Sequence, residues 1–385
     1  MEARTGHDNG MMVSFSRQDG VPTLQDIADR CGVSTATVSL ALRGASRISA
    51  ATTARVLAAA EALGYDPATH LAARQLALRK HGRTALNRAI ALFVPMDFHL
   101  AAYTTSIFRG IMDALQVERF GLVTVYAPEK GELLPLVTAG AVDGAISVLP
   151  FDVDRLLASL RAAPHFGARP VVSLFTRVPG ASSVGADVET GAYLAARHLL
   201  ELGHHVILQI YTGWGDTPRE QRRIEGVRRA MREAGCDPDR HHVLRQIGDH
   251  PLLNPALDPT RALRLPIFRT QPGETPASFL RARPDITAIL AANDGCAIHC
   301  WRWLQAEGFR VPEDYSIIGF DDTEVVLDAA GHNLLTSVCQ PLREMGRAAG
   351  ELAVRQVLDA RVEEQHQLLP ATLSVRHSTA PPGRR

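Results

Sequence analysis

The chain has 385 residues, of which 46% are hydrophobic and 21% charged, and 41 Lys and Arg residues balance 41 Asp and Glu residues. This length allows two or three globular domains, and a net charge of zero says nothing about partners. No run of about 18 apolar residues exists, which excludes a membrane-spanning helix and a membrane partner. The five cysteines are odd in number and no export signal is present, so free thiols in the cytoplasm are expected.

The front of the chain differs from the rest in charge. Residues 1–20 (MEARTGHDNGMMVSFSRQDG) have no apolar core and predict a disordered leader rather than a signal peptide. Residues 21–83 carry eight Arg and Lys residues against four acidic residues, a net charge of +4. A local positive excess is what a polyanionic partner requires.

A short helix is predicted directly after this leader. Thr23 is suited to cap a helix that begins at Leu24, in which Ile27 and Ala28 continue an apolar face. Gly32 is suited to end this helix in the left-handed conformation.

Two more helices follow. Ser34 caps a helix from Thr35 to about Leu42, and Ser49 caps a helix that runs through Leu63. The side chains expected to face inward on them are Val38 with Ala41 or Leu42, and then Val56, Leu57 and Ala60. Helix, tight turn and helix form a helix-turn-helix unit, and the third helix completes a small core.

The stretch TLQDIADRCGVSTATVSLALRG, continued by ISAATTARVLAAAEALGYDP, resembles the DNA-binding headpiece of the LacI/GalR (lactose/galactose repressor) family. The resemblance implies that the second helix lies in the major groove and that Thr35, Ala36 and Leu40 face base edges. Many family members have Arg at the position of Leu40, where this chain can offer only an apolar contact, for instance to a thymine methyl. The other candidate DNA contacts position the headpiece on phosphates or cap its helices, and they are Thr23, Ser34, Thr37, Ser39, Arg43, Arg47, Ser49 and Arg55.

After the headpiece (residues 21–66), the resemblance implies a hinge helix and linker over residues 67–88. In the family this helix folds on DNA and inserts a leucine into the minor groove. The pattern Ala73-Arg74-Gln75-Leu76 matches about two residues late, so the inserted leucine is either Leu71 or Leu76.

Residues 89–385 alternate short apolar runs with helical patterns. Strands are predicted at 89–95, 122–126, 142–148, 171–175, 206–210, 286–291 and 316–319, with a first helix at 104–118. This alternation indicates parallel sheets built from β-α-β units, and the number of strands favours two α/β subdomains.

The same region resembles LacI/GalR effector domains, for example in PDITAILAANDGCAIHCWRWLQAEGFRVPEDYSIIGFDD. The fold class predicted for the chain is therefore an N-terminal all-α helix-turn-helix headpiece plus an α/β periplasmic-binding-protein-like effector domain of two parallel-sheet lobes. The resemblance implies three crossovers between the lobes and a ligand cleft beyond the carboxyl ends of the strands.

Candidate effector-binding residues follow these strands or match the family pattern. Asn293 and Asp294 follow one predicted strand, Asp321 follows another, and the resemblance adds Asp187 and Arg223. Their oxygens and guanidinium suit the hydroxyls of a sugar. Helix capping by Asn293 and turn capping by Asp321 are the structural alternatives, whereas a ligand role is favoured for Asp294 and Arg223 because buried charges need partners.

Aromatic side chains near the same strands are candidates for stacking on a sugar ring. Phe98, Phe175 and Trp214 belong to the proposed site, although core packing is the better expectation for each of them, and for Phe320. The segment 170–177 (PVVSLFTR) lacks the acid that many members carry after this strand. The sugars most often bound in the family therefore cannot be assigned to this chain directly.

Motifs for catalysis or cofactors are missing from the sequence. No phosphate-binding loop, dinucleotide fingerprint or nucleophile elbow occurs, so neither an enzyme nor a cofactor is expected. Cys296, His299 and Cys300 share a helix without a fourth ligand, and no metal site is assigned to them.

The predicted function is a cytoplasmic, sequence-specific transcriptional regulator, most simply a repressor, controlled by a small molecule, favoured to be a sugar. One headpiece contacts half of a palindrome, so a homodimer on double-stranded operator DNA is expected. The alternatives are a cytoplasmic solute receptor and a regulator that responds to a nucleobase or another non-sugar ligand.

Overall fold

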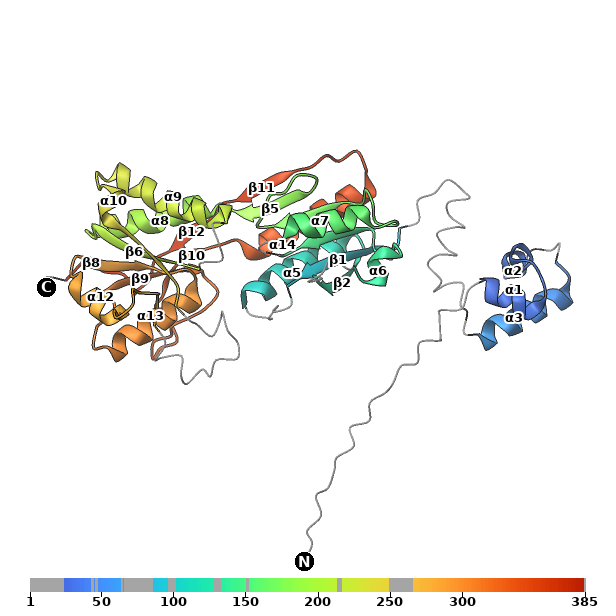
Figure 1. The fold of residues 1–385 in the computed structure, drawn as a ribbon, viewed down its shortest axis with the longest axis horizontal. Coiled ribbons are helices and arrows are strands. Elements are labelled where there is room, and N and C mark those ends of the chain that lie inside the picture. Colours follow the sequence, from blue (N-terminus) through green and yellow to red (C-terminus); the bar gives the residue numbers. More distant parts are fainter. Residues whose placement is uncertain are drawn as a thin grey trace, which may run out of the picture. The chain divides into compact units, whose positions relative to one another are not determined.

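The computed structural model describes residues 24–42, 45, 48–63, 65, 86–95, 102–127, 133–149, 152–212, 217–248 and 266–383. The chain divides into two compact units, Met1–Asn87 and Arg88–Arg385 (Figure 1). Most of the expected hinge helix and seven candidate site residues lie outside the described residues, and the seven are Thr23, Arg43, Arg47, Leu71, Leu76, Phe98 and Trp214.

Three helices form the first unit: α1 (Leu24–Cys31), α2 (Thr35–Ala41) and α3 (Ala50–Ala62). Gly32 has a φ of +63° between α1 and α2, as predicted for a left-handed helix end. The Ser34 and Ser49 side chains accept hydrogen bonds from the backbone N–H groups of Thr37 and Thr52. The predicted helix-turn-helix, with both serine caps, is confirmed.

The core of this unit is small and mostly aliphatic, and it consists of Ile27, Ala28, Val38, Ala41, Val56, Ala59, Ala60 and Tyr65. The prediction that Leu57 faces inward is wrong, because 51% of Leu57 is exposed. Val56, Ala59 and Ala60 stand at helical spacings of three and four and occupy the inward face of α3. Leu57, one position further, points away from that face.

The second unit holds two six-stranded sheets, which define its two lobes (Figure 1). The sheet of lobe 1 has the order β11-β5-β4-β3-β1-β2, and every pair in it is parallel. Its strands are β1 (Ala89–Val94), β2 (Gly121–Tyr126), β3 (Gly144–Ser147), β4 (Val171–Leu174), β5 (Ser182–Ala186) and β11 (His366–Leu369).

The sheet of lobe 2 has the order β12-β10-β9-β8-β6-β7. All its pairs are parallel except β10 with β12, which lie antiparallel at one edge. Its strands are β6 (Val206–Tyr211), β7 (His242–Gln246), β8 (Ile286–Leu290), β9 (Ser316–Asp321), β10 (Thr336–Cys339) and β12 (Thr372–Ser374). The predicted pair of parallel-sheet lobes is confirmed.

Helices cover the faces of both sheets (Figure 1). Lobe 1 carries α5 (Ala102–Val117), α6 (Pro135–Thr138), α7 (Val153–Ala162) and α14 (Leu342–Leu358). Lobe 2 carries α8 (Val188–Glu201), α9 (Pro218–Glu233), α10 (Pro238–His241), α12 (Pro276–Ala282) and α13 (Asp294–Ala306). Buried aliphatic strands explain this cover, since a parallel sheet is stable only when both faces are shielded from water.

The chain passes between the lobes three times: after β5 at Asp187, after β10 at Gln340, and between β11 and β12 at Pro370. The backbone N–H of Asp187 donates to the carbonyl oxygen of Leu369 at 2.8 Å, so two crossovers lie side by side. The three crossovers expected from the family resemblance are therefore present.

Two helix pairs pack with their backbones almost in contact. A Cβ at Gly226 of α9 would lie 2.2 Å from the carbonyl oxygen of Glu189 in α8. A Cβ at Gly346 of α14 would lie 2.1 Å from the carbonyl oxygen of Ile107 in α5. Glycine is needed at both positions because any side chain would push the paired helices apart.

Candidate functional site

The exposed face of α2 is the first candidate site. Thr35 and Ala36 in its first turn are exposed, and Leu40 is half-buried. The Ser34 hydroxyl accepts from the Thr37 N–H at 3.1 Å and lies 2.9 Å from the Thr37 hydroxyl. The hydroxyls of Ser34 and Thr37 therefore lie within hydrogen-bonding distance of each other, while Thr35 and Ala36 add one hydroxyl and one methyl group to the exposed first turn.

The remaining described DNA-contact candidates lie on the second and third helices. Ser39 of α2 is half-buried, and Ser49 caps α3 by accepting from the Thr52 N–H at 3.2 Å. The Arg55 side chain of α3 is exposed, while its carbonyl oxygen accepts from the Cys31 thiol. Ser34 and Ser49 hold the helices in place whether or not they also contact phosphate.

A second candidate site lies where the two lobes meet. We call it the interlobe site, and its residues are Tyr103, Phe175, Arg219, Glu220, Arg223, Asp321 and Gln340. The Tyr103 and Phe175 rings of lobe 1 lie 6.0 Å apart between centroids. The Arg219 guanidinium of lobe 2 lies 5.2 Å from the Phe175 ring centroid, which brings the lobes into contact.

Helix α9 supplies three charged residues of this site. Thr217 caps the helix by accepting from the Glu220 N–H at 3.3 Å, and Pro218 occupies the first turn. Arg219, Glu220 and Arg223 fall within one turn, so their side chains leave the helix from neighbouring positions. Glu220 and Arg223 are 7% and 5% exposed, respectively.

Arg223 is held by its neighbours but keeps one donor unused. Its guanidinium lies 3.9 Å from the Phe320 ring centroid, and it donates to the Ala291 carbonyl oxygen at 3.3 Å. Burial lowers the pKa of Arg223, although nearby Glu220 counteracts this. The Nε atom of Arg223 is buried and has no hydrogen-bond partner among the described residues.

Glu220 keeps an unused acceptor beside it. Its Oε2 atom accepts from the Thr212 hydroxyl at 3.5 Å. Its Oε1 atom is buried without a hydrogen-bond partner in the described part of the chain. An unpaired buried donor and an unpaired buried acceptor are costly, and a bound hydroxyl group can satisfy both.

Asp321 and Gln340 complete the site at the ends of β9 and β10. Gln340 accepts from Arg219 Nη2 at 2.9 Å and donates through Nε2 to Asp321 at 2.5 Å. Burial raises the pKa of Asp321 to about 6, and Arg219 and Arg223 moderate the rise. Phe175 and Asp321 have φ angles of +76° and +104°, strained values for non-glycine residues that concentrate at functional sites.

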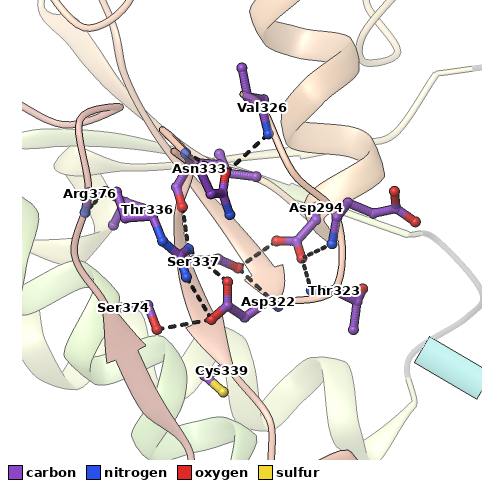
Figure 2. A network of polar contacts seen from close by, with 12 residues as sticks. Asp294, Asp322, Thr323, Val326, Asn333, Thr336, Ser337, Cys339, Ser374 and Arg376 are labelled. Atoms are coloured by element: carbon purple, nitrogen blue, oxygen red, sulfur yellow. Dashed lines mark hydrogen bonds and ion pairs between the residues drawn. The ribbon is translucent and has the colours of Figure 1, made fainter. Parts of the chain in front are cut away.

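Asp294 lies beside this site and is used within the protein (Figure 2). Its carboxylate accepts from the Ser337 hydroxyl at 2.5 Å and from the N–H groups of Thr323 and Glu324 at 2.7 and 3.2 Å. Asp294 is 1% exposed, and burial raises its pKa to about 7. These contacts tie the start of α13 to the segment after β9.

A second carboxylate fixes the other side of that segment (Figure 2). Asp322 pairs with Arg376 through two bonds of 2.7 and 3.0 Å and accepts from the Ser374 hydroxyl at 3.0 Å. Arg376 also donates to the carbonyl oxygen of Leu335 at 2.6 Å. The segment that follows Asp321 is thus anchored on both sides, which holds Asp321 at the carboxyl end of β9.

Two other predicted effector residues cap helices. Asn293 accepts from the Cys296 N–H at 2.8 Å at the start of α13, which is the structural alternative named for it. Asp187 accepts from the Thr190 N–H at 3.0 Å at the start of α8.

The structure brings Phe175, Arg223 and Asp321 together in the interlobe site. Asp187 and Asn293 instead cap helices, and the Asp294 carboxylate accepts hydrogen bonds from Ser337, Thr323 and Glu324. Sequence reasoning missed Tyr103, Arg219, Glu220 and Gln340. Arg219 and Glu220 could have been found from their helical spacing to Arg223, but nothing local marks Tyr103 or Gln340.

Among the described residues, no helix is long and apolar enough to cross a membrane. No group of three or more His, Cys, Asp or Glu side chains in this part of the chain is arranged to hold a metal ion. Cys296 and Cys300 are free and buried in α13.

Comparisons with known proteins cover both units. Residues 23–68 match the model of bacterial regulatory proteins of the lacI family, and residues 196–379 match a periplasmic binding protein-like domain. The HTH-type transcriptional regulator DegA of Bacillus subtilis is 32% identical over 361 residues, which are 93% of this chain and 98% of that protein. CelR of Thermobifida fusca is 30% identical over 93% of this chain and 98% of that protein.

Solved structures give the same architecture. A complex of transcriptional regulator CelR with cellobiose aligns with a TM-score of 0.58 and 26% identity, over 93% of this chain and 99% of that chain. A LacI family regulator of Enterococcus faecium with bound ribose aligns with a TM-score of 0.59 and 25% identity, over 76% of this chain and 99% of that chain.

Proposed function

The chain belongs to the lacI family of bacterial regulatory proteins and is a DNA-binding transcriptional regulator, and we propose from this premise that its interlobe site binds a sugar that controls operator affinity. One observation carries the proposal. Glu220 Oε1 and Arg223 Nε, one turn apart on α9, are both buried and have no hydrogen-bond partner among the residues that the structure describes. A sugar hydroxyl both donates and accepts, so it can satisfy the two atoms together.

The surroundings support the same ligand class. Asp321 and Gln340 offer further acceptors and donors, and the rings of Tyr103 and Phe175 line the side of lobe 1. The solved complexes of related regulators contain cellobiose and ribose. Because the described site is dense in charged and amide groups, we favour a sugar over a nucleobase.

Control of DNA binding follows from population shift. A ligand held by Phe175 of lobe 1 and by Arg223 of lobe 2 favours one arrangement of the lobes. Operator DNA favours the arrangement that suits the headpieces, so each ligand changes the affinity for the other. We propose that the regulator acts as a repressor and binds a palindromic operator as a homodimer, since one headpiece contacts only half of such a site.

A thermal-shift screen of monosaccharides and disaccharides against the full chain tests the sugar site. We expect at least one sugar to raise the melting temperature of the wild type by mass action. Arg223→Ala should abolish this shift and leave operator affinity unchanged. Arg222→Ala is the matched control, because Arg222 is exposed on the same helix and should keep the shift.

Two outcomes contradict the proposal. If Arg223→Ala responds to the same sugar at the same concentration, the sugar does not bind at the interlobe site. If no sugar in the panel stabilises the wild type, the effector belongs to another chemical class.

A further inference from the structure

The outward face of α2 carries two apolar side chains, Ala36 and Leu40, beside the hydroxyl-bearing Thr35. The first residues of the second helix in a helix-turn-helix unit meet base edges in the major groove. In this chain the core side of α2 is taken by Val38 and Ala41, which are 0% and 2% exposed. Ala36 and Leu40 stand one helical turn apart on the other side, where the side chains of i and i+4 are neighbours.

Neither side chain is used by the headpiece core. Ala36 is exposed, and Leu40 is half-buried yet is not among the apolar side chains that pack against the core cluster. The hydroxyls of Ser34 and Thr37, which could have approached the same bases, lie 2.9 Å from each other. Among the described residues, Ala36 and Leu40 therefore form a small apolar surface outside the core cluster of the headpiece.

Only one base offers a matching group in the major groove. The edges of guanine, adenine and cytosine present hydrogen-bond donors and acceptors, whereas thymine adds a C5-methyl group. An apolar side chain against a polar edge leaves that edge without a hydrogen-bond partner, which costs free energy. Contact with a thymine methyl instead removes apolar surface from water on both sides.

We propose that Ala36 and Leu40 recognise the C5-methyl groups of pyrimidines, thymines in ordinary DNA, in neighbouring base pairs of each operator half-site. This specificity depends on apolar contact with the C5-methyl group of the base rather than on a hydrogen bond. Uracil, which pairs like thymine but lacks the methyl group, should be rejected, and 5-methylcytosine should be accepted better than cytosine. The inference goes beyond operator binding itself, which the family membership establishes.

Replacement of single methyl groups in DNA tests the proposal. The full chain first selects its operator from random duplexes, and duplexes with deoxyuridine at each thymine are then compared by fluorescence anisotropy. Deoxyuridine at a contacted position should weaken binding roughly fourfold, as expected for losing the burial of one methyl group. Deoxyuridine at flanking positions should have no effect.

Protein variants connect each position to its side chain. Leu40→Ala should abolish the deoxyuridine effect at one position of the half-site and keep it at the other. Leu40→Met, which preserves an apolar side chain of similar size, should keep both effects. Arg55→Ala is the control for phosphate contact, and it should weaken thymine and deoxyuridine duplexes equally.

The result can overturn the proposal in two ways. A selected operator with guanine opposite Leu40 would show that hydrogen-bonding edges are accepted there. Equal affinity for thymine and deoxyuridine duplexes at every position of the half-site would show that the methyl groups are not recognised, even though the protein binds its operator.

Discussion

Two carboxyl groups in lobe 2, Asp294 and Asp321, have different tasks. The Asp321 carboxylate accepts from the side-chain amide of Gln340, whereas Asp294 accepts three hydrogen bonds. Burial raises the pKa of Asp294 from 3.8 to about 7, and the hydrogen bond from Ser337 moderates the rise. Its ionised form is thus less favourable in the folded chain than in the unfolded chain.

The sign of the pH effect follows from this shift. A group whose pKa is higher in the folded state stabilises the fold fully below its unfolded pKa, and this contribution is lost as the pH rises through the folded pKa. Between pH 4 and 7 the titration of Asp294 should lower the free energy of unfolding by up to about 1.4 kcal/mol per pH unit. Asp294→Asn should remove that slope.

Guanidinium unfolding at several pH values measures this prediction. The difference in unfolding free energy between wild type and Asp294→Asn should change from pH 4 to 7 and become constant above about pH 8. Two curves that run parallel over the whole range would contradict the prediction.

Residue roles were predictable from the sequence only where local chemistry decides them. The caps formed by Ser34 and Ser49 follow from short-range geometry, and both were predicted. Asp294 is a residue type that often binds sugars, but its carboxylate accepts from the hydroxyl of Ser337, more than 40 positions later in the chain. Gln340 reaches the interlobe site only because β10 ends beside β9, and this pairing is not visible along the chain.

At the scale of elements, the close packing of α9 against α8 positions the charged residues of the interlobe site. Gly226 of α9 lies against the backbone of α8, and the same helix carries Arg219, Glu220 and Arg223. Gly226→Ala would place a Cβ 2.2 Å from the Glu189 carbonyl oxygen, so the helices must separate. We expect about 3 kcal/mol of destabilisation, as is typical of an overpacked core, together with weaker sugar binding.

Gly121→Ala is the matched control for this substitution. A Cβ at Gly121 would meet its nearest atom, the carbonyl oxygen of Arg88, at 3.7 Å, an ordinary contact distance. Chemical unfolding and calorimetry with the effector sugar compare the two variants. If Gly226→Ala unfolds at the same denaturant concentration as Gly121→Ala, the close packing of α8 and α9 does not exclude a side chain at position 226.

Elements with long, strongly apolar patterns were predictable, and short edge elements were not. The strand predicted at 89–95 is β1, and the helix predicted at 104–118 is α5 (Ala102–Val117). Strands β11 and β12 have four and three residues, and none of their residues is buried. Such segments carry no apolar signal, because they gain their structure by adding to a sheet that already exists.

At the scale of the whole molecule, three crossovers connect the two lobes. Gln340 occupies one crossover and links Arg219 to Asp321 by hydrogen bonds. We expect the sugar to change operator affinity by roughly 5- to 150-fold, and the operator to change sugar affinity by the same factor. Gln340→Ala should reduce both factors together.

Four dissociation constants test this reciprocity: operator Kd with and without sugar, and sugar Kd with and without operator. Anisotropy gives the first pair and calorimetry the second. Unequal factors in the wild type would contradict a single two-state coupling. A Gln340→Ala variant with weaker sugar binding but an unchanged factor would show that Gln340 serves affinity alone.

The course of the chain through lobe 1 also constrains how the protein is made. Strands β1 to β5 precede all of lobe 2 in the sequence, but α14 and β11 of the same lobe follow most of it. A ribosome therefore releases the last pieces of the first lobe only after most of the second lobe. A premature stop codon after β10 would remove α14 and β11 from lobe 1 and β12 from lobe 2, so a truncated gene would yield neither lobe intact.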